Sequence, residues 1–190
     1  MGSYLLDFGA GSAFASEFPL TIADAALAQI QQAKCVAPGD VAPVIVDGKN
    51  TVELMTWGFP RPNGGIIIYC KADASTVKPM FAKPLKEGRC IVPASGFVGT
   101  KVWRGKEDEE YSISLPERKL MHFAGIKNTF RNAKGQIYQA FVIITMVSTF
   151  QVSPLKERMP YILCGEEQMK NWLAHGKLPS SNLILDIQLR

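Results

Sequence analysis

Residues that build metal and disulfide sites are scarce in this sequence, which has 190 residues but only two histidines and four cysteines. No two cysteines have the CxxC spacing of a zinc site, and two histidines are too few to complete one. A disulfide scaffold is not expected, because a chain of this length can bury a sizeable hydrophobic core. We therefore expect reduced, mostly buried cysteines, no metal and no cofactor.

Long apolar runs are absent as well. No stretch of about 18 apolar residues occurs, which excludes a membrane-spanning helix in this sequence. The segment Ala13-Phe14-Ala15 faintly resembles a signal-peptide cleavage site, but no Lys or Arg precedes it and Asp7 interrupts the apolar run. We expect a cytoplasmic protein with no membrane partner.

Positive charge is in small excess, since 21 Lys and Arg residues against 17 Asp and Glu residues give a net charge of +4. This excess does not by itself indicate a nucleic-acid partner, but it permits a local basic groove. A composition that is 47% hydrophobic and 20% charged is typical of a globular protein.

Strands dominate the pattern of apolar residues. Helices are predicted over Thr21–Ala33, Lys78–Lys86 and Glu166–His175, the last closed by Gly176. Strands are predicted over Ser3–Phe8, Val41–Val46, Thr51–Trp57, Ile66–Cys70, Arg89–Val92, Gly96–Trp103, Tyr111–Leu115, Leu120–Ile126, Ile137–Val147, Tyr161–Leu163 and Leu183–Ile187. Many strands with few helices favour the α+β class. We expect a single domain over residues 1–190, with a mostly antiparallel, barrel-like sheet and a few short helices.

Common catalytic motifs are missing. Gly9-Ala10-Gly11 lacks the third glycine of a dinucleotide fingerprint, and Ser95-Gly96 is not a nucleophile elbow. The acidic run Glu107–Glu110 is interpreted as a solvated hairpin turn. A catalytic Cys–His pair stays open, because such partners meet in space and not in sequence. Residue patterns alone therefore indicate a mildly basic α+β domain and no specific chemistry.

Four segments carry a more specific signal through their order along the chain. They are Val36–Gly39; Trp57–Pro60 with Tyr69–Ala74 and Lys78–Phe81; Arg89–Phe97; and Phe123–Ile126 with Phe141–Thr145, Arg158–Leu163 and Trp172-Leu173. In this order and spacing, over nearly the whole chain, they resemble the SRAP (SOS response-associated peptidase) family. The resemblance implies an SRAP-like fold.

The resemblance also implies chemistry on damaged DNA. SRAP proteins bind single-stranded DNA at abasic sites and crosslink to it through a cysteine at position two, whose amine and thiol close a thiazolidine on the sugar aldehyde. An asparagine, a glutamate and a histidine support this step, and arginines hold the DNA backbone. The same apparatus is credited with removing the protein's own N-terminal residues or reversing the adduct, which gives the family its name.

Each catalytic position of the family is substituted in this chain. Met1-Gly2-Ser3 matches the family opening as if its cysteine were missing, and Tyr69 stands at the position of the asparagine. Gly99 matches the glutamate and Lys156 matches the histidine. Lys156 alone keeps reactive chemistry, because glycine has no side chain to transfer a proton. The parallel changes favour a native loss of the cysteine, although a misassigned gene start also explains Gly2.

A nucleic-acid interface is predicted from the same resemblance. Its residues are Ser3, Pro38, Trp57, Arg61, Lys71 and Arg158. Lys71 and Arg158 keep positive charge at positions that match the family's phosphate contacts. Trp57 and Phe59 offer a stacking face for bases or, as the favoured alternative, pack in the core.

Three functions stay open. The favoured one is an SRAP-like sensor of abasic sites in the DNA damage response, with residual affinity for single-stranded DNA but no stable crosslinking or peptidase activity. The second is an active crosslinker or peptidase that uses Lys156 or the N-terminal amine. The third is a non-catalytic scaffold that binds an unknown protein partner.

Overall fold

The computed structural model describes residues 3–6, 35–47, 51–72, 78–102, 108–118, 120–178 and 183–190. Its helices in these ranges are α3 (Pro79–Glu87) and α4 (Gly165–His175), with a 3-10 turn at Pro116–Arg118. Its strands are β1 (Tyr4–Leu5), β2 (Cys35–Val36), β3 (Val41–Ile45), β4 (Val52–Trp57), β5 (Phe59–Pro60), β6 (Ile66–Ile67), β7 (Tyr69–Lys71), β8 (Arg89–Ala94), β9 (Gly96–Lys101), β10 (Glu109–Ser114), β11 (Met121–Arg131), β12 (Ile137–Val147), β13 (Arg158–Pro160), β14 (Ile162–Leu163) and β15 (Asp186–Leu189). This content confirms the α+β class. The helix predicted over Thr21–Ala33 lies outside the described residues.

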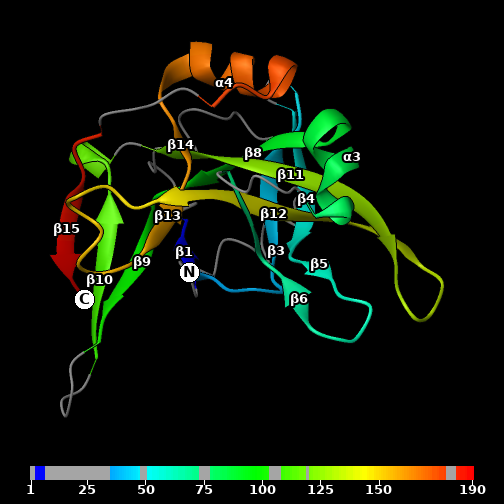
Figure 1. Cartoon of the computed structure of the whole chain (residues 1–190), viewed down its shortest axis with the longest axis horizontal. Helices are drawn as coiled ribbons and strands as arrows, with labels where there is room; N and C mark the ends of the chain where they lie inside the picture. Colours follow the sequence, from blue (N-terminus) through cyan, green and yellow to red (C-terminus); the bar gives the residue numbers. More distant parts are fainter. Residues whose placement is uncertain are drawn as a thin grey trace.

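Five of these strands close into a barrel (Figure 1). β3 pairs antiparallel with β4 on one side and with β8 on the other. β8 pairs with β11, and β11 pairs with β12, again antiparallel. The ring closes where β12 runs parallel to β4, with Phe141 opposite Trp57. The mostly antiparallel, barrel-like sheet expected from the sequence is thereby confirmed.

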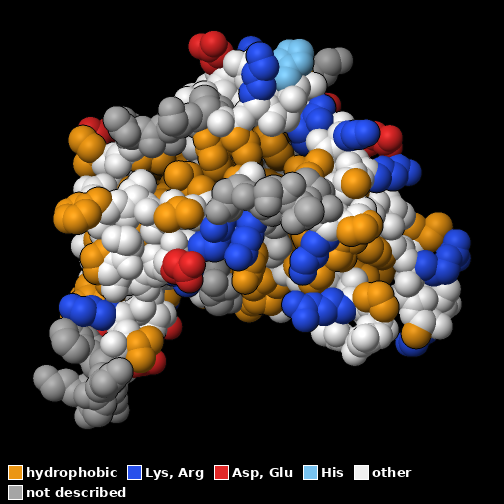
Figure 2. Space-filling view, in the orientation of Figure 1, with side chains coloured by type: hydrophobic (Ala, Val, Ile, Leu, Met, Phe, Trp, Pro, Cys, Tyr) orange, Lys and Arg blue, Asp and Glu red, His pale blue; other side chains and the backbone are white. Residues whose placement is uncertain are grey.

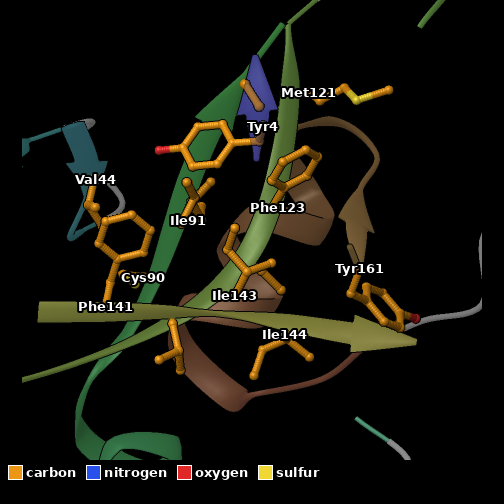
Figure 3. Packing of buried hydrophobic residues seen from close by; sticks show 14 of the residues in the cluster. Tyr4, Val44, Cys90, Ile91, Met121, Phe123, Phe141, Ile143, Ile144 and Tyr161 are labelled. Carbon is orange, nitrogen blue, oxygen red and sulfur yellow. The ribbon is translucent and has the colours of Figure 1, made fainter. Parts of the chain in front are cut away.

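Aromatic and branched side chains fill the barrel. Figure 3 shows the rings of Tyr4 and Phe123 close together, with Ile143 of β12 on the side that faces them and Ile144 on the other side of the strand. The centroids of the Tyr4 and Phe123 rings lie 6.1 Å apart in an edge-to-face arrangement, and both residues are wholly buried. Aromatic pairs of this geometry add to the free energy of burial. The short strand β1 is therefore fixed to the barrel through its tyrosine.

A second antiparallel sheet joins the barrel, in the strand order β15-β10-β9-β1-β2. β1 is an inner strand of this sheet, because Tyr4 pairs with Val36 of β2 on one side and with Phe97 of β9 on the other. The ring of Phe97 also contacts that of Phe123 in the barrel, with centroids 6.2 Å apart. Residues 3–6 are therefore held between β2 and β9, at the junction of the two sheets.

β12 positions the candidate site through its neighbours. Its first part forms a hairpin with β11. Beyond the hairpin, β12 pairs in parallel with β7, so that Thr145 lies beside Lys71. It also pairs antiparallel with β13, so that Val147 lies beside Arg158. Segments that are far apart in the sequence, β7 and β13, therefore meet on the last residues of β12.

The prediction of one continuous strand over Ile66–Cys70 is wrong. The segment divides into β6, which pairs with β5, and β7, which pairs with β12. Between them, the carbonyl of Ile68 accepts hydrogen bonds from the indole of Trp57 (3.0 Å) and from the backbone of Ile143 (3.2 Å). Because the segment changes partner strand, it is not covered along its whole length, and Tyr69 is 39% exposed.

The other boundaries match or shift by a few residues. The strand Ile137–Val147 is found as predicted, and Gly176 closes α4 with a φ of 68°. β11 runs past its predicted end at Ile126, because it continues into the hairpin with β12. The strand predicted over Leu183–Ile187 is shifted to β15, where it pairs with β10.

Candidate nucleic-acid interface

An open pocket of about 190 Å³ lies where β7, β12 and β13 meet. It is lined by Tyr69, Thr145, Lys156, Glu157 and Arg158, and we call it the strand pocket. The sequence predicts Tyr69 and Lys156 as catalytic positions and Arg158 as a DNA contact. The fold brings these three predicted residues together in one place.

Arg158 is held at the wall of the strand pocket by Thr145. Its Nε donates a hydrogen bond to Thr145 Oγ1 (3.3 Å), and its Nη2 donates to the carbonyl of Thr145 (2.9 Å). Thr145 is itself buried, and its hydroxyl donates to the carbonyl of Cys70 on β7 (3.5 Å). The guanidinium is thus oriented before any ligand arrives. An anion that binds here meets a positive charge whose side chain loses little further entropy.

Lys156 reaches the strand pocket from the loop between β12 and β13, and its side chain is half-buried. Its Nζ donates a hydrogen bond to the backbone carbonyl of Val98 on β9 (3.2 Å). Burial lowers the pKa of the Lys156 amine from its ordinary value, because the charged form is partly removed from water. The amine therefore releases its proton more readily than the amine of an exposed lysine.

Gly99 follows Val98 on β9 and is a packing position in this fold. A Cβ built at Gly99 lies 3.0 Å from Cδ1 of Ile113 and 3.1 Å from Cβ of Leu155, which is tighter than ordinary contact. Leu155 directly precedes Lys156. The same loop that brings the lysine into the strand pocket therefore fills the space that a side chain at position 99 needs.

Residues 3–6, the first that the structure describes, lie next to the hydrogen bond between Lys156 and Val98. Tyr4 of β1 pairs with Phe97 of β9 in antiparallel register. One residue further back along β1, this register carries Ser3 towards Val98, whose carbonyl binds Lys156. Ser3 is half-buried there. The predicted contact Ser3 and the predicted catalytic position Lys156 are therefore linked through one residue of β9.

The remaining predicted polar and turn residues are placed as follows. Gly2 lies outside the described residues, and Pro38 is half-buried in the turn between β2 and β3. Lys71 is exposed and lies beside Thr145 in the register of β7 and β12. Arg61 is exposed at the start of the loop between β5 and β6. Figure 2 shows Lys and Arg side chains gathered between the places where Figure 1 draws β13 and β6. A basic surface therefore adjoins the strand pocket.

Trp57 does not belong to this interface. It is wholly buried, and its ring stacks on that of Phe141 with centroids 6.5 Å apart and an interplanar angle of 12°. Phe59 is wholly buried as well. A ring with no exposed face cannot stack on a base, so the prediction of Trp57 as a DNA contact is wrong. The alternative, packing of both residues in the core, is confirmed.

Three residues of this region were not among the predicted site residues. Thr145 and Glu157 line the strand pocket. The motif Phe141–Thr145 is the sequence signal that leads to Thr145, since it belongs to the resemblance. Phe150, on the loop that carries Lys156, is 93% exposed. No periodic pattern marks Phe150, because the strand β12 has ended before it.

The described residues hold no cluster of metal ligands, and their two buried thiols are not activated. No group of three or more His, Cys, Asp or Glu residues in these ranges is placed to hold a metal ion. Burial raises the pKa of the Cys70 thiol to about 11 and also raises that of Cys90, which keeps both protonated near neutral pH. A protonated thiol is a poor nucleophile, so neither is prepared for the catalytic Cys–His pair. Among the described helices, none combines the length and apolar character needed to span a bilayer.

Comparison with known proteins identifies relatives of this chain. The family model described as SOS response associated peptidase (SRAP) matches residues 9–187. The abasic site processing protein YobE of Bacillus subtilis is 32% identical over 146 residues, which are 73% of this chain and 66% of that protein. The abasic site processing protein HMCES of Xenopus tropicalis is 26% identical over 166 residues, which are 72% of this chain and 49% of that protein. The chain therefore spans less than two thirds of the length of these curated relatives.

Solved structures share the fold. A crystal structure of a protein from Bacteroides thetaiotaomicron is 20% identical, with a TM-score of 0.79, and the match covers 100% of this chain and 91% of that chain. A crystal structure of a protein from Bordetella bronchiseptica is 14% identical, with a TM-score of 0.76, and the match covers 100% of this chain and 99% of that chain. These likenesses concern the architecture alone.

Proposed function

Because this chain belongs to the SOS response-associated peptidase (SRAP) family, we propose that it binds single-stranded DNA at abasic sites as part of the DNA damage response. Its curated relatives carry the name abasic site processing protein, which supports this class of substrate. A cytoplasmic location, expected from the sequence, belongs to the same proposal.

The convergence of Tyr69, Lys156 and Arg158 in the strand pocket is the observation that carries this proposal. Arg158 offers a phosphate an oriented guanidinium, and Lys71 adds an exposed positive charge beside Thr145. Contacts to phosphate supply most of the affinity of proteins that bind nucleic acid without reading its sequence. The strand pocket therefore holds the DNA backbone in this proposal.

Binding proceeds without a stable covalent bond. Thiazolidine closure needs an amine and a thiol on one residue, and no cysteine stands next to Gly2, the residue that matches the family opening. Gly99 offers no carboxylate for proton transfer, and Leu155 fills the space in which such a side chain would lie. An imine formed by an amine alone hydrolyses, so an adduct of that kind is transient. The same substitutions argue against peptidase activity.

A second candidate function is an enzyme that uses Lys156. One observation favours it: the amine is half-buried in the strand pocket, and burial lowers its pKa. A neutral amine attacks an aldehyde carbon to give a carbinolamine, which loses water to form an imine. Borohydride reduces this imine to a stable secondary amine. A heat-resistant adduct that needs borohydride, and that Lys156→Arg abolishes, would identify this activity.

The proposed function is tested with a labelled single-stranded oligonucleotide that contains one abasic site. We expect salt-sensitive binding in a fluorescence anisotropy titration and no heat-resistant band in denaturing electrophoresis without borohydride. Lys71→Ala should weaken binding, whereas Lys134→Ala, an exposed lysine in the turn of the β11–β12 hairpin, serves as the matched control. Absence of binding at low salt refutes the DNA-binding proposal and favours a protein-binding scaffold. A heat-resistant band without borohydride refutes the non-covalent part.

A further inference from the structure

The loop over residues 148–157, between β12 and β13, presents an aromatic ring to solvent. Phe150 is 93% exposed, more than any other large hydrophobic residue in the described part of the chain. A single exposed apolar side chain needs no explanation by itself. Two further observations indicate a binding role for Phe150: its loop is ordered, and the same loop carries a cation of the strand pocket.

The loop is ordered by its own hydrogen bonds and by a buried anchor. Val152 is wholly buried, which fixes the middle of the loop to the core. The carbonyl of Thr149 accepts hydrogen bonds from the backbone N–H groups of Val152 (3.0 Å) and Ser153 (2.9 Å). The hydroxyl of Ser153 donates to the carbonyl of Phe150 (3.2 Å). The Phe150 ring is therefore displayed by a fixed turn and not by a loose chain.

The same loop forms part of the strand pocket. The backbone N–H of Ser148 donates to the carbonyl of Glu157 (3.0 Å), which brings the two ends of the loop together. Lys156 and Glu157, at the second end, line the strand pocket. Val147, just before the first end, pairs with Arg158, the oriented cation of that pocket. The loop thus carries the exposed ring of Phe150 and the pocket cation Lys156. The second pocket cation, Arg158, directly follows the loop.

This combination fits a single-stranded nucleic acid better than it fits a protein partner. Proteins that hold single strands combine cations that follow the phosphates with exposed aromatic rings on which bases stack. A loop that carries an exposed ring and Lys156, with Arg158 at its base, offers both kinds of contact, because each nucleotide presents a negative phosphate and a flat apolar base. A hydrophobic protein surface would offer the ring a contact but would bring no negative charge to Lys156 and Arg158.

We propose that Phe150 is a base-stacking residue: when the DNA backbone occupies the strand pocket, the base of a neighbouring nucleotide lies against the Phe150 ring. This inference rests on the proposed function and deepens it, since it adds base contact to backbone contact. It also replaces the stacking role predicted for Trp57, whose ring is buried.

The test compares two oligonucleotides of equal length and charge with three variants. One oligonucleotide is oligothymidine, and the other has tetrahydrofuran residues, which lack bases, in every position. Phe150→Ala removes the ring and Phe150→Trp conserves it. The control, Ile137→Ala, truncates a 65% exposed side chain at the opposite end of β12. None of these side chains is buried, so we expect all three variants to fold.

We expect Phe150→Ala to bind oligothymidine about tenfold more weakly than the wild type, the size of one lost base–aromatic contact. The same variant should bind the oligonucleotide without bases as the wild type does. Phe150→Trp should restore affinity. Its additional tryptophan emission, measured as the difference between the variant and the wild type, should be quenched by oligothymidine. Ile137→Ala should change neither affinity.

Two results overturn the inference while the proposed function stands: Phe150→Ala binds oligothymidine as tightly as the wild type, or it loses affinity equally for both oligonucleotides. The second result would show that the ring acts on the backbone or on the loop and not on bases. If the wild type binds neither oligonucleotide at low salt, the proposed function fails and the inference fails with it.

Discussion

Two half-buried arginines of this fold bind backbone carbonyls, but they do so in different ways. Arg89 donates to the carbonyls of Leu85 (2.7 Å), Leu173 (2.8 Å) and Ala174 (2.9 Å), and it uses each of its three guanidinium nitrogens. It thereby ties β8 to α3 and to the end of α4. Arg158 donates to Thr145 from two nitrogens and lines an open pocket. Arg89 is a clamp within the fold, whereas Arg158 is an oriented charge at the surface.

The pockets beside the two arginines differ in volume and in the residues that line them. The helix pocket, as we call the one beside Arg89, has a volume of about 410 Å³, more than the 190 Å³ of the strand pocket. It is lined by Val46, Asp47, Lys86, Glu87, Arg89, Lys170, Leu173 and Ala174. Two of its three cations have partners nearby, since Lys170 pairs with Glu166 (2.7 Å) and Arg89 is bound to carbonyls. The convergence of the predicted residues Tyr69, Lys156 and Arg158, and not the volume, therefore distinguishes the candidate site.

Restoring a carboxylate near the strand pocket should give the largest effect. In Gly99→Glu, the new side chain meets Ile113 and Leu155 and places a carboxylate in a filled space. We expect the free energy of unfolding to fall by roughly 3 kcal/mol, measured by urea denaturation. Adding Leu155→Ala to Gly99→Glu should recover part of the loss, because it removes the occupying side chain. A Gly99→Glu protein as stable as the wild type contradicts this packing.

Removing the Arg89 side chain should give the second-largest effect, and this effect should be on stability alone. Arg89→Ala leaves the carbonyls of Leu85, Leu173 and Ala174 without their donor. We expect a loss of about 2 kcal/mol in the free energy of unfolding and unchanged affinity for single-stranded DNA. Urea denaturation and anisotropy titration measure the two quantities. A loss of DNA affinity in folded Arg89→Ala protein would instead assign binding to the helix pocket.

Removing the oriented charge of Arg158 should have the opposite result: DNA affinity should fall, and stability should change less than in Arg89→Ala. Arg158→Ala should bind single-stranded DNA about tenfold more weakly, and the slope of log affinity against log salt should shrink by about one. Its effect on stability should be smaller than that of Arg89→Ala. The matched control is Arg131→Ala, an exposed arginine at the far end of β11. Equal losses of affinity in the two variants would indicate general charge attraction and no defined site.

The pH dependence of Lys156 should give the smallest effect. Burial lowers the pKa of its amine, so the charge is lost at a lower pH than that of an exposed lysine. DNA affinity should decline by about threefold as pH rises through this lowered pKa, because one cation disappears. Between the lowered pKa and the ordinary one, only the unfolded chain binds this proton, so its contribution to stability rises with pH in that window.

Lys156→Arg provides the check on this prediction. Arginine stays charged over the whole range, so its variant should keep its DNA affinity where that of the wild type declines. Anisotropy titrations of both proteins at successive pH values make the comparison. Identical pH profiles for the two proteins would show that the Lys156 amine does not contact the DNA.

The sequence predicted long elements well and short ones poorly, for a physical reason. β12 was found over its predicted eleven residues, because its apolar pattern continues over many residues and its hairpin partner follows closely in sequence. Ile66–Cys70 was misjudged because a short apolar run does not reveal which strands cover it. That is decided by tertiary pairing, here with β5 for one half and β12 for the other.

The candidate site was predicted from resemblance, and local patterns did not reveal it. The motifs led to Tyr69, Lys156 and Arg158, which the fold brings together. Trp57 and Phe150 show that the sequence alone does not tell which aromatic side chain is exposed. Trp57 lies in a strand that closes the barrel and is buried, whereas Phe150 lies on a loop and is exposed. Their residue types are similar, and only the position of each in the folded chain separates them.

In the proposed function, single-stranded DNA binds to the strand pocket and not to the helix pocket. A titration of ¹⁵N-labelled protein with an oligonucleotide, followed through backbone amide resonances, tests it most directly. If DNA binds in the strand pocket, the resonances of Tyr69 and Arg158 shift in a saturable manner while those of Arg89 and Lys170 stay in place. Shifts confined to Arg89 and Lys170, or no shifts at any of the four, would contradict it.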